Sequence, residues 1–221
     1  MNPIQQKTLF PLLIGVGIFP FMINGYINSL IADMPILYWG FELFSWVVLP
    51  TFIFGIAIKY GGLDFNSLGL NGKIFGKRNL PLLIIVCIIL CPLDYWLYHE
   101  IYNYFRAVFP STPVFSYQSV IPSVGLWSIV IPIYFSLSAG IVEELYFRGF
   151  MLKTSSLFAY PMLSYLILSP LLFSLAHWEG GVANMLATYI FGVLAALAFL
   201  WLKNLWPLII AHVYTDFMWF S

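Results

Sequence analysis

Charged residues are scarce in this chain: Asp, Glu, Lys and Arg make up 8% of its 221 residues, where average proteins contain about 25%. So few charges cannot cover the surface of a water-soluble globule that is 62% apolar. The formal net charge of zero excludes the basic surface that nucleic-acid binding requires. Two cysteines are too few for a disulfide scaffold. The composition therefore indicates an integral membrane protein.

Long apolar stretches recur along the chain. They do not show the alternation of membrane barrel strands, which are about 9–11 residues long. We predict an all-α integral membrane protein, a bundle of about seven transmembrane helices that forms a single polytopic domain over residues 1–221. Residues 1–125 supply the N-terminal helices, and residues 126–221 supply the helices that carry the motifs described below. The predicted spans are Thr8–Asn28, Ile36–Tyr60, Leu80–Tyr98, Leu126–Met151, Leu157–His177, Val182–Leu202 and Leu205–Phe220.

The basic residues fall mostly on one side of the predicted membrane. With a cytoplasmic N-terminus, seven of them lie in cytoplasmic segments or at that interface, and one lies on the other side. Because such a bias is the usual indicator of orientation, we predict that the N-terminus is cytoplasmic. The seven are Lys7, Lys59, Lys73, Lys77, Arg78, Lys153 and Lys203, and the one outside is Arg106.

A few ionisable residues lie within the predicted spans, where a charge costs roughly 2.5–3.5 kcal/mol on insertion scales. Glu42 and Asp94 lie toward the outer ends of their spans, so we expect them to reach the interface or a helix end. The others gather in the C-terminal half, which favours a functional site there. They are Glu143, Glu144, Arg148, His177, His212 and Asp216.

The charges of the fourth span are spaced as an ion pair. Glu144 and Arg148 are four residues apart and share one helix face, where each stabilises the charge of the other. Glu143 is rotated by about 100° from Glu144 and faces elsewhere. Ala139 and Gly140 lie one turn earlier on that side, and their small size leaves room for water or for another backbone.

His212 and Asp216 also share a helix face, since they are four residues apart. If spans four and five form an antiparallel hairpin with its turn near Tyr160–Pro161, Glu143 and His177 come level with each other. A carboxylate beside two histidines is typical of general acid–base chemistry or of a metal site. A purely structural set of ion pairs explains only the Glu–Arg pair.

Three motifs follow one another on these spans. Residues Glu143–Arg148 read EExxxR, Phe173–His177 read FxxxH, and His212–Asp216 read HxxxD, a variant of HxxxN. In this order they resemble the CPBP family, the CAAX-processing and bacteriocin-processing (Abi) intramembrane endopeptidases. The resemblance extends over about Ser136–Asp216, and the helices before it match only in being hydrophobic.

The resemblance implies an α-helical bundle with a polar, water-filled cavity inside the membrane, in which a glutamate-activated water hydrolyses a peptide bond. By position in the motifs, Glu143 is expected to be the base, and His177 to bind and polarise the water. Glu144 and Arg148 are expected to hold their helix in place. No cofactor is expected, and the implied partners are membrane lipids and a membrane-tethered peptide or protein substrate.

The same resemblance implies that His212 and Asp216 stabilise the oxyanion of the reaction. Asp216 departs from the family pattern, because an asparagine amide donates a hydrogen bond and an ionised aspartate cannot. Asp216 is then either protonated or an acceptor that orients His212, and we favour the second interpretation.

Other functions stay open on the sequence alone. A zinc-dependent membrane protease would use His177, His212 and a carboxylate as ligands, although the chain has no HExxH motif. A non-catalytic immunity or peptide-binding protein would not need every proton-transfer group. A transporter is disfavoured because the sequence shows no internal repeat. The compact chain resembles bacterial members of the family, which favours a bacterial plasma membrane as its location.

Overall fold

The computed structural model describes residues 3–72 and 79–221, and within these ranges the regular secondary structure is entirely helical. Five helical segments in them are long and apolar enough to cross a membrane, and two helices of 15 residues each complete the bundle. The predicted all-α membrane fold is therefore confirmed. Lys73, Lys77 and Arg78, on which the orientation partly depends, lie outside the described residues.

The first half of the chain forms three long helical segments and a connecting strap. In chain order its elements are α1 (Pro3–Ile31), α2 (Pro35–Leu43), η1 (Phe44–Val48), α3 (Leu49–Gly61), α4 (Leu80–Val108) and η3 (Tyr117–Val120). The helix α2, the π-helical η1 and α3 are continuous and form a single segment. Residues 109–126, here called the strap, contain η3 and lead from α4 into the second half.

The second half carries the three motifs. Its elements are α5 (Trp127–Glu143), η4 (Glu144–Phe150), α6 (Met151–Ser155), α7 (Pro161–Leu175), η5 (Trp178–Gly180), α8 (Gly181–Leu202) and α9 (Trp206–Phe220). The helix α5, the π-helical η4 and α6 are continuous. The helix α7 is shorter than the predicted span Leu157–His177, because the chain turns after α6 and the helix starts only at Pro161.

Prolines mark several helix starts. The helices α2, α4, α7 and α9 each carry a proline in the first two positions. Proline lacks the N–H group that would be unpaired there, and its ring already holds the helical φ angle. Each proline therefore favours the start of its helix at this position.

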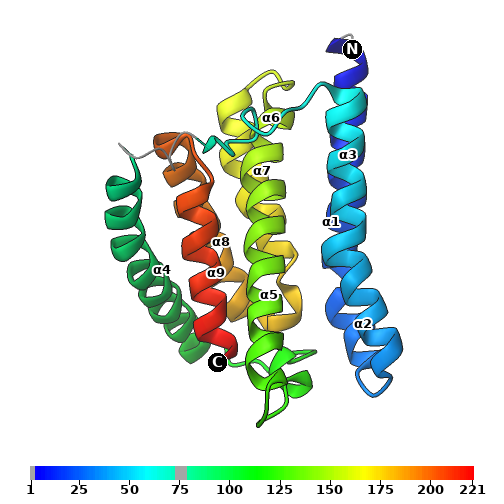
Figure 1. Ribbon diagram of the computed structural model, residues 1–221, viewed down its shortest axis with the longest axis vertical. Coiled ribbons are helices and arrows are strands. Elements are labelled where there is room, and N and C mark those ends of the chain that lie inside the picture. Colours follow the sequence, from blue (N-terminus) through cyan, green and yellow to red (C-terminus); the bar gives the residue numbers. More distant parts are fainter. Residues whose placement is uncertain (1–2, 73–78) are drawn as a thin grey trace.

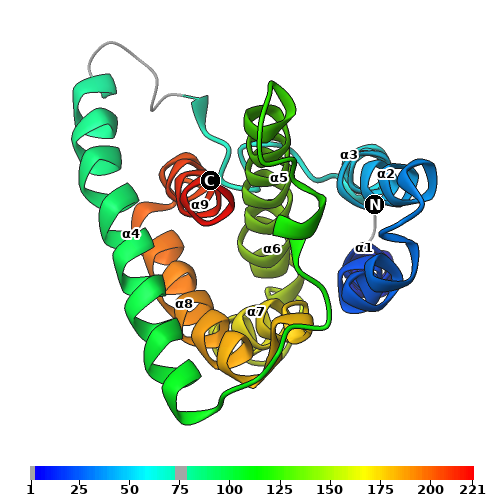
Figure 2. The same ribbon diagram turned by 90° about the horizontal axis from the view of Figure 1, so that it is seen from below.

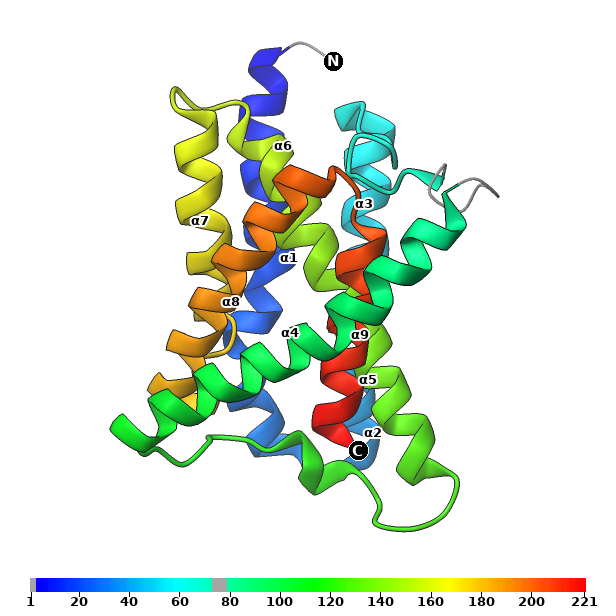
Figure 3. The same cartoon turned by 90° about the vertical axis from the view of Figure 1, so that its left-hand side faces the viewer.

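The continuous segment of α5, η4 and α6 runs through the middle of the bundle (Figure 1). Seen along the bundle, α1, α2 and α3 lie on one side of this segment, and α9, α8 and α4 lie on the other (Figure 2). The helix α4 crosses α8 and α9 obliquely and packs against both (Figure 3). Buried side chains from both halves, among them Phe54, Tyr146 and Phe150, form a shared hydrophobic core.

The strap crosses the lower end of the bundle in Figure 1, where α1 ends and α5 begins. The backbone N–H of Val114 donates to the carbonyl oxygen of Glu179 at 2.7 Å. The hydroxyl of Tyr117 accepts a hydrogen bond from Asn24 Nδ2 at 2.7 Å. The side chain of Phe115 is buried. These contacts attach the strap to η5 and α1.

Basic residues gather at the upper end of the part of the bundle that the structure describes. Lys7 lies early in α1, Lys59 in the last turn of α3, Lys153 in the last turn of α6, and Lys203 directly after α8. These helix ends lie together at the top of Figure 1. Arg106 lies in the last turn of α4, at the opposite end (Figure 3). The four lysines thus lie at one end of the bundle and Arg106 at the other, as the prediction of the orientation requires.

Candidate active site

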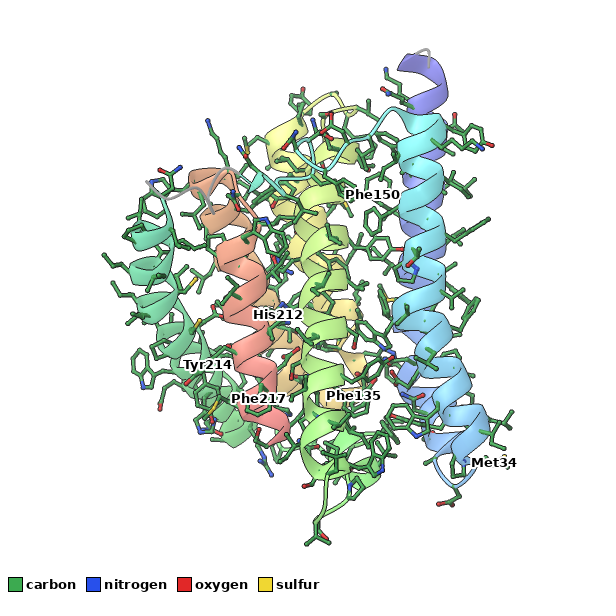
Figure 4. All side chains as sticks on the ribbon, viewed as in Figure 1. Met34, Phe135, Phe150, His212, Tyr214 and Phe217 are labelled. Atoms are coloured by element: carbon green, nitrogen blue, oxygen red, sulfur yellow. The ribbon has the colours of Figure 1, made fainter. Side chains whose placement is uncertain are left out.

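The three motifs meet where α5, α7 and α9 face one another. Glu143 is the last residue of α5, His177 follows α7, and His212 lies within α9. Figure 4 shows His212 between α9 and α5, about midway along the bundle. The Oε2 atom of Glu143 lies 3.5 Å from Nε2 of His212 and 4.0 Å from Nε2 of His177. The structure therefore brings together the carboxylate and the two histidines that the sequence singled out.

The other ring nitrogen of each histidine is held by a hydrogen bond. Nδ1 of His177 lies 2.8 Å from the carbonyl oxygen of Phe173, and because a carbonyl only accepts, Nδ1 carries the proton. Nδ1 of His212 lies 2.9 Å from Oε1 of Glu144 and donates to that carboxylate. These bonds orient both rings so that each Nε2 faces Glu143.

Glu144 connects the motifs on two helices. Its Oε1 accepts from His212 and also lies 3.0 Å from Nη1 of Arg148, so the predicted ion pair is present. Arg148 is 0% exposed, and its guanidinium group lies 4.4 Å from the ring centre of Phe173. Glu144 thus makes the hydrogen bond that orients His212, a task that the sequence analysis gave to Asp216. The two carboxylates lie at different nitrogens of the His212 ring. Glu144 lies at Nδ1, whereas Oδ2 of Asp216 lies 3.6 Å from Nε2, on the side of Glu143.

The α9 helix also contacts α4, through Asp94. Thr215 donates a hydrogen bond from its hydroxyl to Oδ2 of Asp94 at 3.2 Å. The expectation that Asp94 reaches the interface was therefore wrong, because α4 crosses α9 and presents this carboxylate to it. Asp94 joins the polar groups near the site as a contact that sequence spacing does not reveal.

The helices α5 and α9 approach each other closely at Gly140. A Cβ atom there would lie 2.6 Å from Cγ2 of Val213 and 3.0 Å from its backbone nitrogen. Small residues at such positions let two helix backbones come together. Since Val213 follows His212, this contact brings His212 toward Glu144. Ala139 lines the cavity. Of the two small residues, Gly140 therefore makes room for another backbone and Ala139 borders the cavity.

A cavity of about 190 Å³ extends from the glutamate–histidine cluster to the strap. Glu42 is only 1% exposed and lines this cavity, so the expectation that it reaches the interface was wrong. The segment of α2 and η1 packs against α5 and turns Glu42 inward. Glu179 lines the cavity too, and the sequence analysis missed it; its only signal was its position two residues after His177.

A widened helical turn follows Glu143 and carries the rest of the EExxxR motif. The element η4 starts at Glu144, directly after Glu143, and its π-helical hydrogen bonds give it a wider turn than an α-helix. Such turns are frequent at functional sites. The predicted hairpin is present, because α6 ends at Ser155 and α7 begins at Pro161. The hairpin was readable from the sequence, whereas the π-helical turn was not.

The described part of the chain does not offer a metal site. Within residues 3–72 and 79–221, no group of three or more His, Cys, Asp or Glu side chains is placed to hold a metal ion. Cys87 and Cys91 are free thiols in α4. Glu143, His177 and His212 do not form such a group either.

Fold and site together define a polytopic helical membrane protein with a buried glutamate–histidine cluster. Residues 125–218 match the family model described as Type II CAAX prenyl endopeptidase Rce1-like. The match covers all three motifs and confirms the resemblance to the CPBP family, so it supports a membrane protease. No curated protein and no solved structure matches the chain.

Proposed function

We propose that this protein is an intramembrane endopeptidase that hydrolyses a peptide bond of a membrane-associated protein or peptide with a water molecule activated by Glu143. The observation that carries the proposal is the convergence of two imidazole Nε2 atoms on Oε2 of Glu143 within a cavity. At 3.5 and 4.0 Å these atoms are too far apart for good direct hydrogen bonds, and the cavity that all three side chains line leaves space for a water molecule beside them.

Hydrolysis would proceed through a tetrahedral intermediate. Glu143 takes a proton from the water while the water oxygen forms a bond to the carbonyl carbon, and the carbonyl electron pair moves onto its oxygen. Nε2 of His177 accepts a hydrogen bond from the same water, because its Nδ1 carries the proton. The C–N bond then breaks, and Glu143 passes the proton to the leaving amine.

His212 is suited to stabilise the developing oxyanion. With both ring nitrogens protonated, it donates Nδ1–H to Glu144 and Nε2–H toward the cavity. The ion pair of Glu144 with Arg148 holds the ring before the reaction begins, so little reorganisation is needed when charge develops. This is the positioning role that we assign to Glu144 and Arg148.

Mapping of new peptide termini tests the proposal. Membranes from cells that carry wild-type protein are compared with membranes that carry Glu143→Gln, and protein termini are identified by mass spectrometry. We expect termini that occur only with the wild type, and their flanking residues identify the substrate. Identical termini, with the variant inserted at equal amount, would contradict the proposal and favour a peptide-binding protein.

Asp216→Asn is expected to retain activity within about tenfold of the wild type, a loss below ~1.4 kcal/mol of transition-state stabilisation. Glu144 keeps His212 oriented in this variant, and an asparagine amide can donate to the oxyanion. The rate of cleavage of the mapped substrate is the measurement, with Asp216→Ala as the variant expected to lose more. Complete loss in Asp216→Asn would show that the carboxylate itself is needed.

We also propose that the N-terminus is cytoplasmic and that the protein resides in a bacterial plasma membrane. On this orientation the strap lies outside the cell and the turn after α6 inside. In a Cys87→Ala/Cys91→Ala background, we expect a membrane-impermeant maleimide to label Ser123→Cys in intact cells and Ser156→Cys only after permeabilisation, since both positions are exposed. The reverse labelling pattern would invert the orientation.

A further inference from the structure

A second group of polar side chains lies in the same cavity, on the side of α1, α2 and the strap. Glu42 and Glu179 contribute two carboxyl groups, and Asn24 and Tyr117 line the cavity beside them. The Tyr117 hydroxyl accepts hydrogen bonds from Asn24 at 2.7 Å and from Asn28 at 3.4 Å. The reaction proposed above uses none of these five residues.

Glu42 is buried and only partly satisfied. Its Oε1 accepts a hydrogen bond from Asn28 Nδ2 at 3.2 Å, and Tyr38 is a further polar neighbour of its carboxyl group. Its Oε2 has no hydrogen-bond partner among the described residues, although the residue is 1% exposed. A buried carboxylate without a cationic partner is costly, because it has lost water and the neutral phenol of Tyr38 supplies no counter-charge.

Glu179 is in a similar situation. It is 8% exposed, and its Oε2 also finds no hydrogen-bond partner in the described part of the chain. Its side chain is confined by α1: a Cβ atom on Gly25 would lie 2.2 Å from the Cβ of Glu179. The carbonyl of Glu179 holds the strap through Val114, so the residue lies where α1, η5 and the strap meet.

The phenol of Tyr117 is close enough to both carboxyl groups to be affected by their charges. Burial, followed by the nearby Glu42 and Glu179, raises the pKa of Tyr117 well above its usual value. The phenol therefore stays neutral and cannot act as the counter-charge of either glutamate. The polar neighbours that the structure shows here are amides and phenols, which carry no positive charge.

The cavity as a whole is acidic. Among the described residues that line it, four are carboxylates and none is Lys or Arg; the four are Glu42, Glu143, Glu179 and Asp216. Arg148 is already paired with Glu144, and His212, the cation of the proposed mechanism, donates to the same carboxylate. A cationic group that enters the cavity is therefore favoured, and the unpaired oxygens of Glu42 and Glu179 provide acceptors for its N–H donors.

We propose that Glu42 and Glu179 form a subsite that binds a lysine or arginine side chain of the polypeptide that occupies the cavity. That the ligand is a polypeptide rests on the proposed function. The aliphatic stem of a basic side chain suits the apolar lining, which includes Phe21, Trp46 and Phe115, while its charged end reaches the carboxylates. The cavity would thus select substrates with a basic residue at a fixed distance from the cleaved bond.

A binding experiment tests the subsite separately from catalysis. Full-length Glu143→Gln protein in detergent micelles is titrated with two randomised peptide mixtures, which have either lysine or norleucine at one fixed position. Binding is followed by tryptophan fluorescence, since Trp46 and Trp219 line the cavity. We expect the lysine mixture to bind about tenfold or more tightly, because hydrogen bonds to charged groups are among the stronger ones.

Matched variants identify the carboxylates responsible. In the same background, Glu42→Gln and Glu179→Gln should each weaken the preference for lysine, and the double variant should abolish it. Glu100→Gln removes an exposed carboxyl group from α4 and should leave the preference unchanged. Each glutamine keeps the size of the side chain, and the thermal unfolding midpoint identifies any variant that fails to fold.

The two proposals fail in different ways. Equal binding of the two mixtures, or a lysine preference that survives the double variant, would overturn the subsite. A lysine preference that depends on Glu42 and Glu179, together with no cleavage by the wild type, would support the subsite and contradict the protease. Cleavage without any enrichment of lysine or arginine near the mapped termini would support the protease and contradict the subsite.

Discussion

Glu143→Gln is expected to lower the rate of peptide hydrolysis by roughly 10²–10⁴-fold, the usual contribution of a positioned general base. Glutamine has nearly the same shape as glutamate, but it cannot take the proton of the attacking water. The hydrogen bonds that orient His177 and His212 involve Phe173 and Glu144, so they persist in the variant. The measurement is the cleavage rate of the substrate identified from its termini, with purified protein.

Stability provides the control for this variant. Glu143 is 5% exposed, and its Oε2 has no hydrogen bond within the described residues, so its neutralisation should not destabilise the fold. We expect an unfolding midpoint at or above that of the wild type. Wild-type cleavage rates in a folded Glu143→Gln protein would remove Glu143 from the mechanism, and loss of folding would leave the rate uninterpretable, in which case Glu143→Asp replaces it.

Arg148→Met is expected to destabilise the protein by about 3–5 kcal/mol, the usual effect of removing one partner of a buried ion pair. Arg148 is 0% exposed and lies 3.0 Å from Oε1 of Glu144. Methionine fills part of the space but removes the guanidinium group from the carboxylate of Glu144, which keeps only His212 as a partner. It also removes the contact of the guanidinium group with the ring of Phe173. The free energy of unfolding in mixed micelles is the measurement.

A double variant separates lost charge balance from lost packing. Glu144→Gln/Arg148→Met removes both charges, so it should recover part of the stability that Arg148→Met loses. It should not recover activity, because Glu144 also orients His212. Lys153→Met, a half-buried cation in the last turn of α6, is the matched control and should change stability little. Equal stability of Arg148→Met and the wild type would show that the pair is not structurally important.

The sequence anticipated the class of the fold and the residues of the cluster. Apolar runs predicted the helices, and the turn expected near Tyr160–Pro161 lies directly at the start of α7. Spacing of four residues predicted the contact of Glu144 with Arg148, since it depends only on local helix geometry. The order of the three motifs led to the resemblance to the CPBP family, and residues 125–218 match the model described as Type II CAAX prenyl endopeptidase Rce1-like.

The contacts between helices had to come from the tertiary structure. The hydrogen bond of Glu144 to His212 joins residues 68 positions apart, and no local pattern determines which carboxylate faces Nδ1. Asp216 was assigned that task because an ionised aspartate cannot donate to an oxyanion, but its carboxylate lies on the side of Nε2. The inward direction of Glu42 depends on how the segment of α2 and η1 packs against α5.

By itself, the sequence determined that the chain is a helical membrane protein and which ionisable residues share a helix face, because hydropathy and spacing within one helix are local properties. The tertiary structure decided which oxygen faces which nitrogen, and it assembled Glu42 of α2 and Glu179 of η5 into the same cavity as Glu143. Those relations depend on the rotation and crossing of packed helices, which are set by the sum of many side-chain contacts across the bundle.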